Sequence, residues 1–86
     1  MPTISRFYGI NIEMYWYDHQ PPHFHAIYAG EDATVSIPSG EVRCGRLPPR
    51  IARFVREWTE KHILEIWEDW RRGQNGETFL PIEPLD

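Results

Sequence analysis

The chain contains 86 residues, with nine basic against thirteen acidic side chains and a formal net charge of −4 at pH 7. That balance argues against bulk attraction to nucleic acid, and the lack of an apolar run of about 20 residues argues against a membrane span. With Cys44 as its one cysteine and no secretory signal pattern at its start, we expect a soluble cytoplasmic protein that folds as a single domain over residues 1–86.

The first half of the chain has the pattern of an antiparallel sheet. Residues 10–17 alternate between apolar and more polar side chains, which predicts a strand with one apolar face. That face would carry Ile10, Ile12, Met14 and Trp16. Turn-forming residues separate further short stretches, so the sheet would have three to four strands, at about residues 10–17, 23–28, 33–37 and 41–45. Because the loops between them are short, neighbouring strands would be antiparallel.

The second half predicts a helix, or a bent helix pair, at about residues 49–72. Its earlier and later apolar side chains fall on faces about a quarter-turn apart, so we expect a bend or break near Glu60 to His62. The glycines at 73 and 76 would end the helix, and residues 78–85 would form an extended tail on the core or across a partner. The predicted fold class is therefore α+β, a small sheet packed against a C-terminal helical segment.

Three of the four histidines lie within seven positions, beside a pair of prolines. His23 and His25 are two apart in a predicted strand, so their side chains would point to the same side, about 7 Å apart at the Cα atoms. His19 lies in the preceding loop, and Asp18 could serve as a carboxylate ligand or orient an imidazole. The candidate metal ligands are thus His19, His23, His25 and Asp18, for a divalent transition metal such as zinc.

An alternative for these histidines is purely structural. They could pack against Tyr15, Tyr17 or Tyr28 with their nitrogens hydrogen-bonded. Other catalytic patterns are absent: the serines and glycines match no nucleophile or phosphate-loop motif, and Cys44 is interpreted as a buried core thiol. Any catalytic residues stay unidentified, and an enzymatic function would depend on the histidines alone.

A run of arginines precedes and opens the predicted helix. Positive side chains there oppose the helix dipole, which suggests that another interaction favours them. The candidate binding surface, for phosphate or for carboxylates of a partner, consists of Arg43, Arg46, Arg50 and Arg53. The alternative is a solvated helix face with pairs four residues apart, such as Arg53 with Glu57.

The order of landmarks resembles one bacterial family along nearly the whole chain. The most specific segment is Asp18-His19-Gln20-Pro21-Pro22-His23-Phe24-His25-Ala26, and further landmarks are Phe7-Tyr8-Gly9, Gly45-Arg46-Leu47-Pro48, Glu57-Trp58 and Pro81-Ile82-Glu83-Pro84-Leu85. The chain is similar to the domain-of-unknown-function family 4160. This resemblance implies a small stand-alone protein, often encoded beside another short protein, and no established catalytic role.

Three functional interpretations stay open. The leading one is a small interaction or regulatory protein that acts with a genomically neighbouring partner in a toxin–antitoxin-like module, or as a homo-oligomer. The second is a metal-dependent hydrolase or nuclease that uses His19, His23 and His25, with the arginines holding a phosphate. The third is a nucleic-acid-binding transcriptional regulator, which the net charge does not favour.

Overall fold

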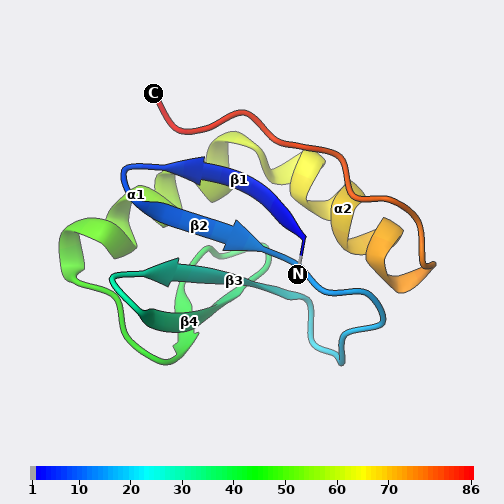
Figure 1. The fold of residues 1–86 in the computed structure, drawn as a ribbon, viewed down its shortest axis with the longest axis horizontal. Coiled ribbons are helices and arrows are strands. Elements are labelled where there is room, and N and C mark those ends of the chain that lie inside the picture. The colour runs from blue at the N-terminus through cyan, green and yellow to red at the C-terminus, as the bar shows by residue number, and fades with distance from the viewer. Residues whose placement is uncertain (1) are drawn as a thin grey trace.

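The computed structural model describes residues 2–86 and has the predicted α+β class. Five strands come first and form one sheet in which each strand pairs antiparallel with the next along the chain. The strands are β1 (Thr3–Phe7), β2 (Ile10–Glu13), β3 (His23–Tyr28), β4 (Glu31–Ser36) and β5 (Val42–Cys44). Two helices follow, α1 (Pro49–Lys61) and α2 (Ile63–Gln74). In Figure 1, α1 runs behind the strands, and α2 continues towards the end where β2 leads into β3.

The number of strands is higher than the predicted three to four, because β1 was missed. Its alternation of side chains is interrupted by a register shift between Thr3 and Ser5, so the period of two that marks a strand is not visible in the sequence. A tight turn at Tyr8 and Gly9, with φ of 50° and 79°, joins β1 to β2. Such a turn has positive φ at both central positions, as hairpins of this length require.

The strand predicted at residues 10–17 is too long. β2 ends at Glu13, which faces His25 at the last paired position of β2 and β3. The chain then leaves the sheet, and the backbone N–H of Tyr17 donates to the carbonyl of Gly73 at 3.0 Å. Trp16 consequently does not share the buried face of Ile10, Ile12 and Met14, and its side chain is 46% exposed.

The predicted break in the helical segment is confirmed. His62 lies between α1 and α2 with φ of −118°, outside the helical range, although its N–H still donates to Trp58 O at 3.0 Å. The break lets each helix turn its own apolar face to the core. That core contains Val55 and Trp58 from α1, Ile66 from α2 and Phe24 from β3, all fully buried.

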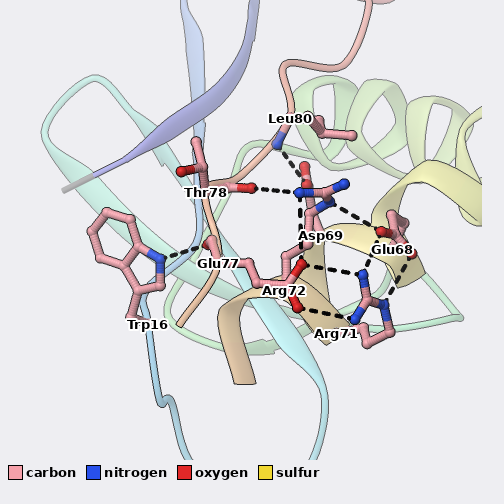
Figure 2. A network of polar contacts seen from close by, with 8 residues as sticks. All are labelled: Trp16, Glu68, Asp69, Arg71, Arg72, Glu77, Thr78 and Leu80. Carbon is pink, nitrogen blue, oxygen red and sulfur yellow. Dashed lines mark hydrogen bonds and ion pairs between the residues drawn. The ribbon is translucent and has the colours of Figure 1, made fainter. Parts of the chain in front are cut away.

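The C-terminal tail lies along the free edge of β1, as an extended tail on the core would. The N–H of Ile82 donates to Ile4 O at 2.8 Å, and the indole N–H of Trp58 donates to Glu83 O at 2.9 Å. Figure 2 shows how the start of the tail is held, with Arg72 donating to Thr78 O at 3.2 Å. The tail therefore completes the sheet edge and part of the core.

Cys44 is exposed, so its interpretation as a buried core thiol is wrong. It ends the three-residue edge strand β5, which pairs with β4 on one side only, and the edge leaves its side chain in solvent. Within residues 2–86, neither helix has the length and apolar character needed to cross a membrane.

Candidate metal centre

Three of the four predicted metal ligands converge at the start of β3. One donor atom each from Asp18, His23 and His25 lies within 4.8 Å of the other two. Both imidazoles face the same carboxylate oxygen: Asp18 Oδ2 is 2.9 Å from His23 Nε2 and 3.8 Å from His25 Nε2. The two rings are 5.4 Å apart at their centroids, because residues two apart in a strand point to the same side.

These separations suit one small metal ion. Zinc binds imidazole nitrogen and carboxylate oxygen at about 2.0–2.2 Å, so two ligands of a tetrahedral ion lie about 3.3 Å apart. The distances of 2.9 and 3.8 Å from Asp18 Oδ2 to the two histidine nitrogens lie on either side of that value. The third separation, between the donor atoms of the two histidines, is within 4.8 Å, so all three donors are close enough for side-chain movements to bring them onto one ion.

His23 is oriented by the rigid turn before it. Its side chain is 2% exposed, and its Nδ1 lies 2.8 Å from Pro21 O, which can only accept a hydrogen bond. The proton on Nδ1 therefore faces the carbonyl, and Nε2 faces the Asp18 carboxylate, which is a second acceptor. A neutral ring has one N–H to donate, so a metal ion between Nε2 and Asp18 would leave both ring nitrogens with a partner.

His25 is oriented in a similar way by a residue that the sequence did not indicate. Its Nδ1 lies 3.1 Å from Asp32 Oδ1, which leaves Nε2 to face Asp18. A carboxylate behind a ligating histidine is a recurrent feature of metal sites. In the sequence, only the short loop that brings β4 back beside β3 could have indicated that Asp32 lies near His25.

Tyr15 packs against His25. The purely structural interpretation of the histidines predicted such a contact with Tyr15, Tyr17 or Tyr28. The two rings are 4.7 Å apart in an edge-on arrangement. Burial raises the pKa of Tyr15, and the neighbouring Glu13 carboxylate raises it further. Its hydroxyl therefore stays protonated and donates to Glu13 Oε1 at 3.3 Å. This packing covers one side of His25 and leaves Nε2 available to the cluster.

His19 lies at the rim of the site and outside the converging set. Its side chain is 75% exposed, and its Nε2 lies 3.8 Å from Asp18 Oδ1. Its backbone contributes more directly, because the His19 N–H donates to Asp18 Oδ1 at 2.9 Å. That hydrogen bond holds one carboxylate oxygen and turns the other, Oδ2, towards the two imidazoles.

Helix α2 supports the loop that carries Asp18. The Gln74 side-chain amide donates to the backbone carbonyl of Asp18 at 2.9 Å. The Trp70 ring lies 5.5 Å from the ring of His23 and closes the inner side of the site. Asp18 is thus fixed from a position 56 residues later in the chain, which no local sequence pattern could indicate.

Two arginines of the predicted binding surface, Arg50 and Arg53, lie away from this cluster. Arg50 and Arg53 lie in the first turns of α1, at the opposite end of the molecule from the loop between β2 and β3 in Figure 1. Arg43, in β5, and Arg46, just after it, are exposed. The expected pair of Arg53 with Glu57 is present at 3.7 Å. The geometry therefore does not place Arg50 and Arg53 to hold a phosphate at the histidines.

Comparison with known proteins places the chain in a family. A family model described as "Domain of unknown function (DUF4160)" matches residues 9–71. The chain belongs to this family. The match spans the whole histidine and proline segment and most of both helices. No curated protein matches the chain, and no solved structure matches it. Membership in the DUF4160 family names no activity, so the functional argument depends on the site itself.

Proposed function

We propose that this protein is a metal-dependent hydrolase that binds one divalent transition metal, with zinc the best fit, through Asp18, His23 and His25. The observation that carries the proposal is the convergence of two imidazole nitrogens and one carboxylate oxygen within 4.8 Å of one another. Two histidines and one carboxylate are a ligand set of catalytic zinc and of other open transition-metal sites. The geometry supports the second of the three sequence-based interpretations best.

The site is reachable from solvent, which favours a catalytic over a closed structural metal. His23 is buried, whereas the side chains of Asp18 and His25 keep 15% and 18% of their surface exposed. A structural zinc site usually has four protein ligands, and this cluster has three. When bound, the ion would supply Lewis-acid activation of a water molecule for hydrolysis.

The residues around the ligands prepare the site. The Pro21 carbonyl and the Asp32 carboxylate each bind the Nδ1 of one histidine and so direct both Nε2 atoms inward. The His19 N–H holds Asp18 Oδ1. These contacts fix the donors in advance, and such support typically changes metal affinity 10- to 100-fold.

Metal analysis of protein prepared without a histidine tag tests the proposal. Native mass spectrometry after incubation with zinc, manganese or nickel should show one bound ion per chain, and His25→Ala should abolish it. Asp32→Ala should keep the site but weaken binding about 10- to 100-fold. His62→Asn is the matched control, since His62 lies at the helix break, and it should bind metal normally.

Hydrolysis is measured separately on bis(4-nitrophenyl) phosphate and 4-nitrophenyl acetate. We expect turnover of at least one of them that a chelator and His25→Ala both remove. Absence of stoichiometric metal would overturn the whole proposal, and metal binding without hydrolysis of either ester would overturn its catalytic part. The regulatory or toxin–antitoxin-like role with a partner protein stays a prediction from the family resemblance.

A further inference from the structure

The end of the molecule opposite the metal centre carries a second group of chemically distinctive side chains. Tyr8, in the turn between β1 and β2, lies 4.9 Å from the ring of Phe54 on α1. The guanidinium carbons of Arg50 and Arg53 lie 5.4 and 6.0 Å from the centre of the same ring. We call these four residues the arginine–aromatic surface.

Tyr8 is not used to build the core. Its side chain is 51% exposed, and its backbone has φ of 50°, a conformation that favours glycine or asparagine over a large side chain. The positive φ belongs to the two-residue turn that Tyr8 forms with Gly9, and Ala29 before Gly30 has the same φ of 50°, so the turn sets this backbone conformation. A large aromatic ring is not needed to form such a turn; here it contacts Phe54 and leaves about half of its surface open to solvent, where a planar group can stack.

The positive charge on this surface is largely uncompensated. Arg50 has no acidic side chain within 4.0 Å in the described part of the chain, and Arg53 has only its exposed pair with Glu57 at 3.7 Å. The first turn of α1 contains no acidic residue. An open depression of about 580 Å³ adjoins the surface and includes Arg6 and Tyr8 in its lining. Planar rings beside the unpaired guanidinium of Arg50 and the exposed guanidinium of Arg53 suit a ligand that has both planar and anionic parts.

We infer that the arginine–aromatic surface binds single-stranded nucleic acid, with a base stacked on Tyr8 and neighbouring phosphates held by Arg50 and Arg53. Proteins bind single strands through aromatic stacking combined with a cationic path for the backbone. The net charge of −4 and the small number of arginines disfavour a duplex, which would need a longer basic surface and offers no unstacked base.

This inference does not depend on the metal centre. The two sites lie at opposite ends of the molecule in Figure 1, and no residue is shared between them. Binding is therefore measured in the presence of a chelator, so that a failure here and a failure of the proposed hydrolase are distinguishable.

Fluorescence anisotropy with labelled oligouridine and oligothymidine of about 12 nucleotides tests the inference. We expect binding that weakens with added salt, with a slope of log K against log salt of about −1.4 if Arg50 and Arg53 contact two phosphates. Tyr8→Asn should lower the affinity about 5- to 100-fold, because base stacking is lost. Asparagine also suits the backbone conformation of Tyr8, so the thermal midpoint should not fall.

Three further variants make the test specific. Arg50→Ala should weaken binding and flatten the salt slope, whereas Tyr8→Phe should keep the affinity because it keeps the ring. Lys61→Ala is the matched control, since it removes one positive charge at the far end of α1, where Lys61 pairs only with Asp86 at 3.3 Å. Equal binding of RNA and DNA, or a preference for either, supports the inference. Undetectable binding, equal binding of a duplex, or affinity unchanged in Tyr8→Asn and Arg50→Ala would overturn it.

Discussion

Asp69 is a single buried acid that holds the C-terminal tail. Its side chain is 1% exposed, Oδ1 accepts the N–H of Leu80 at 2.8 Å, and Oδ2 is buried without a hydrogen-bond partner (Figure 2). Burial raises the pKa of Asp69 from 3.8 to about 6, against the lowering effects of the Leu80 N–H and of Arg72. The charged form therefore costs the folded state free energy at neutral pH.

This raised pKa predicts a pH dependence of stability. The unfolded chain loses the Asp69 proton near pH 4 and the folded chain near pH 6, so this group's contribution falls as the pH rises between those values. Asp69→Asn keeps an acceptor for Leu80 and removes the titration. Relative to the wild type, the variant should gain about 1–3 kcal/mol of unfolding free energy between pH 4 and 7, measured by urea unfolding.

The control for this measurement is Asp86→Asn, which removes an exposed carboxylate at the end of the tail. That variant should follow the wild type across the pH range. A constant difference between Asp69→Asn and the wild type at all pH values would contradict the prediction.

At the residue scale, the candidate metal ligands were easier to predict from the sequence than the residues that orient them. His23, His25 and Asp18 were predicted as candidate ligands because strand alternation and a proline-containing turn are patterns of neighbouring residues. Asp32 could not be identified, because its role depends on the pairing of β3 with β4. His19 is the predicted third nitrogen ligand, and the structure places its side chain at the rim of the cluster.

At the element scale, the helix break was predictable and the strand limits were not. The earlier and later apolar faces of the helical segment point in different directions, so a break was expected whatever the tertiary packing. The break lies at His62. The end of β2 depends instead on α2, because the N–H of Tyr17 donates to the carbonyl of Gly73 in that helix. Because this contact joins residues far apart in the chain, no local sequence pattern indicates where the strand ends.

The tail predicts a measurable contrast between two neighbouring positions. Ile82 is 4% exposed and joins the core, whereas Leu80 is 46% exposed. Ile82→Ala should lower the unfolding free energy by about 2–4 kcal/mol, through lost burial and the cavity left behind. Leu80→Ala should cost less than about 1 kcal/mol, since its side chain already contacts water. Equal losses in urea unfolding would show that the tail does not pack as an element of the fold.

At the scale of the whole molecule, the candidate metal centre joins two distant parts of the chain. The loop before β3 supplies Asp18, and the end of α2 fixes that loop through Gln74. Gln74→Ala should therefore weaken metal binding several-fold while changing the thermal midpoint little. Isothermal titration with zinc measures the effect, and Gln20→Ala in the same loop is the control because its side chain makes no hydrogen bond within residues 2–86. Equal affinities for the two variants would contradict a supporting role of α2.

The hydrogen bond between the tail and β1 has a consequence for how copies of this protein meet. A sheet with open edges can recruit strands from other molecules and grow into aggregates. Here the tail occupies one edge at Ile82 and Ile4, and the other edge is the three-residue β5 with a register shift beside it. In the described chain, this hydrogen bond at Ile4 and the shortness of β5 leave less unpaired backbone at the two edges for a strand of another molecule to pair with.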